Sequence, residues 1–487
     1  MTQTSKLAIT LSIFAVALRL VLIDQPYIDQ WSWRQSDVAS IARNFEKNGF
    51  HFAYPQIDWA GDASGYVGTE FPILPFLAAL CYKLAGVHEW IGRSQAVIFF
   101  AVSLPFFFLV VREIFGDMAA TWATFFYSFA PLNIFAGRSF MPDVPSLSLA
   151  LIGLYFFLRW IDNEQPASFV WAAFAILLAL LIKLPTAIIG ASLLFLVWQK
   201  WRWNFLRQPA LWLFAAMTIL PSVAWYWHAH QIADRFYPYH FFGAGGFRIE
   251  DFAWYWKTAR STATSSLTPI LSAVAIIGLC VAPRRKHARL FHWWLGATIL
   301  FIIVAGYGNR HPWYQLPLVP ISATFAGAGC TFVASKISSS RVTMITLSVL
   351  VAGSFSIFAY VCVQPLYQPS AAALRAAALE LRKSTSPDAL IIAADNGDPT
   401  VFYYAERRGW HFLEKDGIYA GDPNDSQGLI VDFERLRKRG ATHLVFTTNT
   451  FWWLDYYPEF AQHLGQTATL LEARTQFKIY QLTAAAR

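Results

Sequence analysis

Two acidic residues bracket a polar, aromatic segment near the N-terminus. Asp29 and Asp37 lie on either side of two tryptophans and an arginine in residues 29–37 (DQWSWRQSD). A carboxyl group partly dehydrated beside tryptophan can have a raised pKa, which suits a general base. The structural alternative is that Asp37 caps a helix beginning near Val38, because Asp is a favoured N-cap residue. The two roles are compatible.

A second polar segment, residues 137–143 (GRSFMPD), separates two apolar runs. Its acidic residue, Asp143, lies between two prolines, at the mouth of an apolar run. The structural alternative is that Asp143 is the N-cap of the following helix, a common position for Asp. Arg138, five residues earlier, is a candidate either for its ion-pair partner or for a phosphate ligand.

Cationic residues also interrupt the apolar sequence. Lys183 stands alone in residues 180–185 (LLIKLP), where its anion would be a lipid headgroup or a substrate phosphate. Arg310 and His311, followed by Trp313 and Tyr314, form a second cationic patch. Arginine and lysine both bind phosphate well, arginine through a bidentate fork.

The elements that carry these residues are membrane-spanning helices. The chain has 487 residues, of which 56% are hydrophobic and only 14% are charged, whereas soluble domains carry about 25% charged residues. A helix of about 20 apolar residues crosses a bilayer, and the sequence predicts a polytopic α-helical membrane protein with about eleven spans. The predicted spans are 7–23, 93–112, 118–136, 143–161, 169–183, 185–200, 209–228, 267–283, 291–307, 313–334 and 342–362. The first lacks a small-residue cleavage site and is interpreted as a retained span.

Charge in the loops predicts the orientation. Lys and Arg concentrate in alternate loops, and the positive-inside rule makes those loops and the N-terminus cytoplasmic. The net charge of +8 therefore reports topology and does not indicate nucleic acid binding. The remaining loops, including 24–92 and 229–266, lie outside. We expect the segments that contain Asp37, Asp143, Lys183 and Arg310 to share this outer face.

The sequence divides into a membrane module, residues 1–365, and a C-terminal domain, residues 366–487. Strands predicted at 389–394, 443–447, 467–472 and 477–482 alternate with helical segments, which is typical of a small α/β domain. The domain carries no phosphate-binding glycine loop, nucleophile elbow or Cys/His cluster, and we interpret it as a structural or acceptor-binding cap. The four cysteines of the chain lie far apart, without metal-type spacing.

Carboxylates and cations together on an outer membrane face favour transfer of a group from a phosphate-bearing lipid. An acidic residue would accept the proton of an incoming hydroxyl, and cations would stabilise the departing phosphate. Two other classes of function stay open. A lipid or solute transporter would carry ionisable groups near the middle of several spans, and few occur here. A non-catalytic membrane scaffold would leave the Trp-rich acidic segment unexplained.

Several motifs resemble those of a known family. They are residues 33–37 (WRQSD) with 41–43 (IAR), residues 70–72 (EFP) before an amphipathic stretch at 73–84, Arg138 with residues 141–145 (MPDVP), and residues 311–317 (HPWYQLP), together with the turn at 183–185 (KLP). Over about residues 1–335, this set resembles the GT-C membrane glycosyltransferases of glycosyltransferase family 39. That family includes protein O-mannosyltransferases and the enzymes that put aminoarabinose on lipid A.

The resemblance implies a sugar donor on undecaprenyl phosphate or another polyprenyl phosphate, inverting transfer to an external acceptor hydroxyl, and location in a bacterial inner membrane. Asp37 would be the catalytic acidic residue of the first outer loop, and Asp143 would match the acidic residue of the second. The acidic pair of many members falls on Arg34 and Gln35 here, so Asp29 is the alternative base.

The remaining site residues follow from the same resemblance. The donor phosphate would be held by Lys183, Arg138, Arg310 and His311. Contacts with acceptor or donor would come from Trp33, Arg34, Glu70, Trp313 and Tyr314. The implied partners are the lipid-linked sugar, an acceptor glycan, lipid or protein, and membrane lipids. We expect no obligatory metal, because two carboxylates alone are thin ligation for a divalent cation, although Asp37 and Asp143 leave room for one.

Overall fold

The computed structural model describes the whole chain except residues 1–2, 238–245, 282–284, 338–339, 416–417 and 485–487. The chain forms two compact units. The first comprises residues 1–23, 93–226 and 243–366, and the second comprises 24–92, 227–242 and 367–487. Residues 24–92, one of the predicted outer loops, thus belong to the same unit as the C-terminal sheet. The predicted boundary between residues 365 and 366 stays a prediction.

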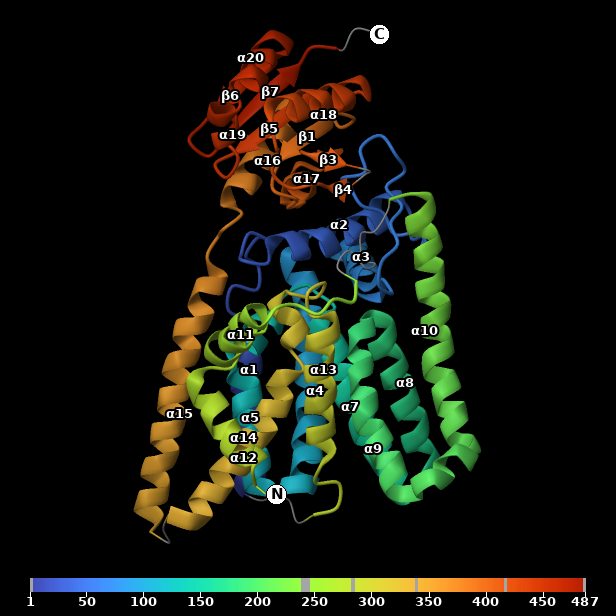
Figure 1. Cartoon of the computed structure of the whole chain (residues 1–487), viewed down its shortest axis with the longest axis vertical. Helices are drawn as coiled ribbons and strands as arrows, with labels where there is room; N and C mark the ends of the chain where they lie inside the picture. Colours follow the sequence, from blue (N-terminus) through green and yellow to red (C-terminus); the bar gives the residue numbers. More distant parts are fainter. Residues whose placement is uncertain (1–2, 238–245, 282–284, 338–339, 416–417, 485–487) are drawn as a thin grey trace. The chain divides into compact units, whose positions relative to one another are not determined.

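The first unit is helical (Figure 1). Its elements, α4 and α10 extending into the second unit, are α1 (Gln3–Arg19), α4 (Glu89–Phe115), α5 (Asp117–Phe129), α6 (Pro131–Ala136), α7 (Asp143–Asn163), α8 (Pro166–Ile182), η1 (Leu184–Ile189), α9 (Gly190–Trp201), η2 (Arg202–Arg207), α10 (Pro209–Arg235), α11 (Phe252–Ser261), η3 (Thr262–Ser266), α12 (Pro269–Leu279), α13 (Leu290–Ala305), η4 (Pro312–Gln315), α14 (Leu318–Ile337), α15 (Arg341–Val363) and η5 (Gln364–Tyr367).

The protein is a polytopic membrane protein. Within the described ranges, six helices are long and apolar enough to cross a membrane, or seven if the bent pair Phe252–Ser266 and Pro269–Leu279 is one span. Each of the eleven predicted ranges overlaps a helical segment. Two of them, Pro166–Ile182 and Leu290–Ala305, are apolar helices shorter than 18 residues. The number eleven therefore stays a prediction.

One predicted span is broken. The range 118–136 divides into α5 and α6, because Ala130 is extended, with φ −60° and ψ 132°, and Pro131 opens the next helix. A residue before proline is disfavoured in the helical conformation, and proline is well tolerated at the first helical position. The break brings the chain to the second polar segment at residue 137.

Small residues allow close helix packing in this unit. Helix α14 packs against both α5 and α12. A Cβ added at Gly278 of α12 would lie 1.7 Å from the carbonyl oxygen of Phe325, and one added at Gly327 would lie 2.2 Å from that of Ala119. Backbones approach this closely in membrane helices only where side chains are minimal.

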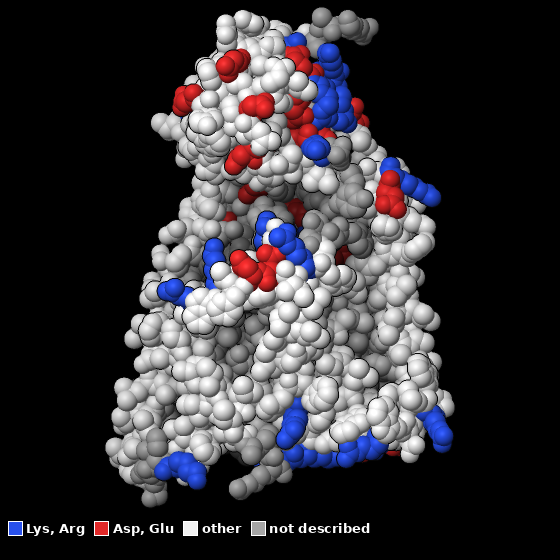
Figure 2. All heavy atoms as spheres, in the orientation of Figure 1, with Lys and Arg blue, Asp and Glu red and all other residues white. Residues whose placement is uncertain are grey.

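Basic residues gather at one end of the helical unit. Figure 2 shows a band of Lys and Arg there, at the end where Figure 1 draws the connection between α9 and α10. Lys200 lies in the last turn of α9, and Arg202 and Arg207 lie in η2, which connects α9 to α10. The clustering agrees with the pattern from which the orientation is predicted, and the orientation itself stays a prediction.

The second unit contains α2 (Ser32–Asn48) and α3 (Ile73–Ala85), followed in sequence by the C-terminal elements. These are α16 (Ala372–Ser384), β1 (Leu390–Ala394), α17 (Thr400–Ala405), β2 (Arg408–His411), β3 (Glu414–Lys415), β4 (Ile418–Tyr419), α18 (Ser426–Lys438), β5 (His443–Thr447), α19 (Trp452–Tyr456), α20 (Pro458–Thr467), β6 (Ala468–Ala473) and β7 (Phe477–Leu482). The four strands predicted in the tail are present, and the strands β2, β3 and β4 were missed.

Five strands form one sheet in the order β2-β1-β5-β7-β6. β1 is parallel to β2 and β5, whereas β7 is antiparallel to β5 and β6. Alternate residues point to opposite faces. Ile392 and Phe446 pack with Phe433 and Phe460 from α18 and α20 in one core. Because β1 and β5 are buried along their lengths, they read as continuous apolar runs, which made them recognisable in the sequence.

Candidate functional site

In the second unit, one arginine joins two carboxylates. Arg34 and Asp37 lie one turn apart on α2 and form an ion pair, with Asp37 only 1% exposed. Arg34 Nη2 also donates to both carboxylate oxygens of Glu70, at 2.8 and 3.0 Å. The structure thus brings together three predicted site residues, Arg34, Asp37 and Glu70. One guanidinium therefore contacts two carboxylates.

The structural alternative for Asp37, an N-cap of a helix beginning near Val38, is wrong. Helix α2 begins at Ser32, so Asp37 lies in its second turn. The earlier start depends on Asp29, whose carbonyl accepts from Ser32 N at 3.0 Å and whose Oδ1 accepts from Trp31 N at 3.2 Å. These local hydrogen bonds turn the chain into the helix, a recognised property of Asp.

Asp29 itself is fully buried, and its Oδ1 also accepts from Gln35 Nε2 at 2.7 Å. Both contacts keep the carboxylate directed at the start of α2. Trp33, in the first turn of the helix, is partly buried. Asp29 and Asp37 therefore occupy different settings, the first among neutral donors and the second beside an arginine.

In the first unit, Asp143 and Lys183 form a buried ion pair. Asp143 Oδ1 lies 2.5 Å from Lys183 Nζ, and the two side chains are 3% and 6% exposed. Lys183 Nζ also lies 4.3 Å from the centroid of the Tyr314 ring. Residues from three distant parts of the sequence therefore meet around one ammonium group, a combination of ionic and cation–π contacts.

Two expectations for Asp143 need correction. It is the first residue of α7 and not its N-cap, which is Pro142. Its ion-pair partner is Lys183 and not Arg138. The helix termini explain the pairing: Asp143 is at the positive N-terminal end of α7, and Lys183 follows the negative C-terminal end of α8, so both charges also face a favourable helix dipole.

Polar groups that the sequence did not single out hold Lys183 in place. Its backbone is extended, with φ −156° and ψ 107°, between α8 and η1. The Tyr226 hydroxyl donates to Leu181 O at 3.1 Å and accepts from Leu184 N at 3.2 Å. Ser146 Oγ donates to Ala179 O at 2.7 Å. Tyr226 thus bonds backbone groups that lose their helical partners where the membrane helix breaks. The available signal was Pro185, which has no N–H to donate to Leu181 O.

The other predicted cations have separate settings. Arg138 is fully buried, donates to Leu22 O, and lies 5.8 Å from the Phe135 ring centroid. Arg310 is exposed. His311 stacks on Trp313, with ring centroids 4.5 Å apart and planes 8° apart. Of the predicted phosphate-binding residues, Lys183 is the one placed in contact with Asp143.

A cavity of about 460 Å³ opens within the second unit, lined in part by Trp59, Tyr237, Trp410, Glu414 and Arg439. Burial raises the pKa of Tyr237, and the nearby charges of Glu414 and Asp37 raise it further. Tyr237 therefore stays a neutral hydroxyl that lies within electrostatic reach of Asp37. Nothing in the sequence had marked this residue.

Over the described part of the chain, no group of three or more His, Cys, Asp or Glu residues could hold a metal ion. Asp37 and Asp143 each have a cationic partner instead. The expectation that no metal is obligatory stays a prediction.

The fold and these sites define a class: a polytopic α-helical membrane protein with an α/β sheet unit and buried acid–cation pairs. The fold is that of the GT-C membrane glycosyltransferases. The sequence pattern of the dolichyl-phosphate-mannose-protein mannosyltransferase family matches residues 69–227, about a third of the chain. None of the curated protein sequences matches the chain significantly.

The chain is similar to solved structures of other proteins along nearly its entire length. ArnT from Cupriavidus metallidurans, solved bound to undecaprenyl phosphate, is similar with a TM-score of 0.70 and 15% identity over 99% of both chains. The Archaeoglobus fulgidus oligosaccharyltransferase, solved with Zn and sulfate, is similar with a TM-score of 0.61 and 12% identity, over 96% of this chain and 72% of that one. The predicted resemblance to GT-C glycosyltransferases of the protein O-mannosyltransferase kind is thereby confirmed.

Proposed function

We propose that the protein is a membrane glycosyltransferase that moves a sugar from a polyprenyl phosphate, undecaprenyl phosphate in a bacterial inner membrane, to an acceptor hydroxyl outside the cytoplasm. The observation that carries the proposal is the likeness, along the whole of both chains, to a protein solved with undecaprenyl phosphate. The acid–cation pairs supply chemistry that such a transfer needs. The acceptor is a glycan, lipid or protein, and nucleic acid plays no part.

Asp37 is the proposed general base. It would accept the proton of the acceptor hydroxyl while that oxygen attacks the anomeric carbon, and the bond from that carbon to the phosphate oxygen would break in the same displacement. The product would carry inverted anomeric configuration. Arg34, which bonds both Asp37 and Glu70, would keep the carboxylate ionised and oriented. Asp29 is the alternative base.

Lys183 is the proposed ligand of the donor phosphate. A lysine that already pairs with Asp143 can exchange part of that contact for a phosphate oxygen without leaving an isolated buried charge. Arg138, Arg310 and His311 are proposed as further phosphate ligands. Contacts with the sugar or acceptor are assigned to Trp33, Glu70, Trp313 and Tyr314.

An apolar cavity of the first unit suits the prenyl chain. It measures about 370 Å³ and lies among α7, α8, η1, α9 and α10. Its lining includes Leu180, Ile189 and Phe214, and η1 directly follows Lys183. A hydrocarbon tail in such a cavity is stabilised by burial of its own apolar surface, and its phosphate end could then approach Lys183.

The proposal also covers membrane topology, domain boundaries and metal dependence. We propose about eleven spans, a cytoplasmic N-terminus, an extracytoplasmic active site, a membrane module of residues 1–365, a C-terminal domain of residues 366–487, and catalysis without an obligatory metal.

The decisive experiment uses the isosteric variant Asp37→Asn. Purified protein in detergent would receive an undecaprenyl-phosphate sugar and an acceptor, and products would be identified by mass spectrometry. Loss of the base should reduce transfer by at least about 100-fold in protein that remains folded and monodisperse, because Arg34 keeps its contact with Glu70 in this variant. Asp24→Asn, an exposed carboxylate in the same segment, is the matched control. Full turnover by Asp37→Asn would remove Asp37 as the base and direct attention to Asp29.

The sugar and acceptor need a separate experiment. Mass spectrometry of lipid-linked sugars and envelope glycans from cells lacking the protein should reveal an accumulated donor and a missing modification. Unchanged lipids and glycans would argue against the proposal.

A further inference from the structure

Helix α2, which carries Arg34 and Asp37, is polar and yet buried. Its sequence is SWRQSDVASIARNFEKN, and thirteen of its seventeen residues are buried. Polar groups can be buried at low cost only when they are hydrogen-bonded or paired. The contacts that satisfy this helix therefore determine where its side chains point.

The first contacts come from the end of strand β1. In the sheet, β1 lies between β2 and β5, and the chain passes from β1 to β2 on one side before it reaches β5 on the other. Open α/β sheets usually bind ligands at the carboxyl end of a strand in this position. Here Asp398, just beyond β1, accepts a hydrogen bond from Ser32 Oγ at 2.6 Å. The Thr400 and Ser36 hydroxyls lie 3.0 Å apart. The N-terminal half of α2 is thus bonded where a ligand would be expected.

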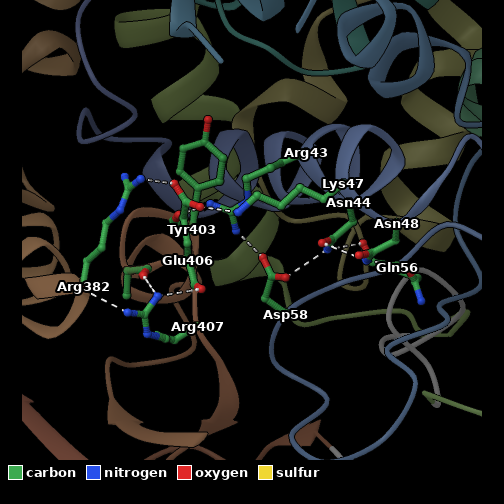
Figure 3. A network of polar contacts seen from close by, with 11 residues as sticks. Arg43, Asn44, Lys47, Asn48, Gln56, Asp58, Arg382, Tyr403, Glu406 and Arg407 are labelled. Atoms are coloured by element: carbon green, nitrogen blue, oxygen red, sulfur yellow. Dashed lines mark hydrogen bonds and ion pairs between the residues drawn. The ribbon is translucent and has the colours of Figure 1, made fainter. Parts of the chain in front are cut away.

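The second half of α2 is held by the following residues (Figure 3). Arg43 donates to the Tyr403 carbonyl, its guanidinium lies 4.7 Å from the Tyr403 ring centroid, and its Nη2 donates to Asp58 Oδ2 at 2.6 Å. Lys47 pairs with Glu406, which also pairs with Arg382 at 2.8 Å. Helix α17 packs against α2 between these contacts.

The side chains of α2 that make these contacts lie on one face of the helix. At 100° per residue, Ser32, Ser36, Arg43 and Lys47 fall within about 60° of one another, whereas Arg34 and Asp37 are centred about 140° away. Rotation or fraying of α2 would therefore move Asp37 as a direct consequence.

We propose that residues 398–406 position helix α2, and that Arg43 is a positioning residue for Asp37. The carboxyl edge of the C-terminal sheet then supports the reaction by holding α2. The inference rests on the proposed function for the role of Asp37, but the support of α2 can be measured without any transfer reaction.

The test compares two Arg→Gln substitutions. Arg43→Gln removes the contacts with Asp58 and Tyr403 (Figure 3). The control, Arg474→Gln, removes the contacts of a half-exposed side chain with Glu380 and Glu472, which lie outside α2 and residues 398–406. Hydrogen–deuterium exchange of peptides covering 32–48 would be measured in the full-length protein, together with kcat and KM for the lipid-linked donor.

For Arg43→Gln we expect amide exchange in α2 to be at least tenfold faster. We expect kcat to fall about 100-fold, because a displacement of a catalytic group by about 1 Å reduces the rate by this much. KM should change less than threefold. Arg474→Gln should match the unsubstituted protein in all three. Arg43→Lys should recover part of kcat. Unchanged α2 exchange in Arg43→Gln, or fast exchange with full kcat, would overturn the proposal.

If Arg43→Gln does not fold, Thr400→Val decides the question, because it keeps the side-chain shape and removes only the hydroxyl that meets Ser36. Faster exchange confined to α2 supports the proposal, and unchanged exchange overturns it. The two proposals fail separately. A fully active Asp37→Asn variant would refute the assigned base while the exchange result stands, and normal exchange beside an inactive Asp37→Asn variant would refute only the positioning role.

Discussion

The ion pair between Lys183 and Asp143 permits a prediction in which stability and activity separate. The two charged atoms are 2.5 Å apart and both side chains are at least 94% buried. Removal of one partner from a buried pair costs about 3–5 kcal/mol, because the other charge remains desolvated without its partner. Lys183→Met should therefore lower the free energy of unfolding by about this amount.

The double variant Lys183→Met with Asp143→Leu should behave differently. Replacement of a buried pair by apolar residues of similar volume is often neutral or stabilising. We expect its stability to return to within about 1 kcal/mol of the original protein, whereas glycosyl transfer stays lost because the proposed phosphate ligand is gone.

Thermal unfolding in detergent, followed by the fraction that remains monodisperse after heating, would rank the variants. Lys200→Met is the matched control: Lys200 lies 2.6 Å from Glu164, whose side chain is 68% exposed, so Glu164 stays hydrated without its partner and melting should change little. A Lys183→Met variant as stable as the control, or a double variant no more stable than the single one, would refute this reasoning. A fully active double variant would refute the role of Lys183 in binding phosphate.

Other predictions concern the second unit and metal dependence. Burial raises the pKa of Asp398, so the folded state holds this proton to a higher pH than the unfolded chain does. Stability should therefore fall as pH rises from the unfolded pKa of about 3.9 through the raised one. The melting temperature of Asp398→Asn should depend less on pH than that of Asp388→Asn, a control at an exposed site. Parallel curves of melting temperature against pH for the two variants would contradict this. Gly61 has φ +64°, and an added Cβ would lie 1.9 Å from Trp410 Cε2. Gly61→Ala should thus destabilise by more than about 1 kcal/mol, whereas Gly465→Ala, with open space in helix α20, should stabilise by about 0.5–1 kcal/mol; equal melting temperatures would count against the clash. Chelators should leave transfer unchanged, and a loss restored by Mg²⁺ or Mn²⁺ would show that a metal is required.

Local patterns were sufficient for much of the fold. Strands β5 and β7 lie at the predicted residues, because an apolar run bounded by turn residues has few other structures available to it. Apolar runs likewise indicated the helices. The break at Pro131 was missed because hydrophobicity extends across it, although the proline itself was the signal.

The sequence by itself determined that the chain is a polytopic membrane protein with polar segments between its apolar runs, because composition and apolar run length depend only on local transfer free energies. Only the tertiary structure decided which charges are partners. Asp143 pairs with a lysine forty residues away instead of the arginine five residues away, and α2 is held by residues more than 350 positions later in the sequence. Such pairings depend on how helices and strands pack, and no local pattern records that packing.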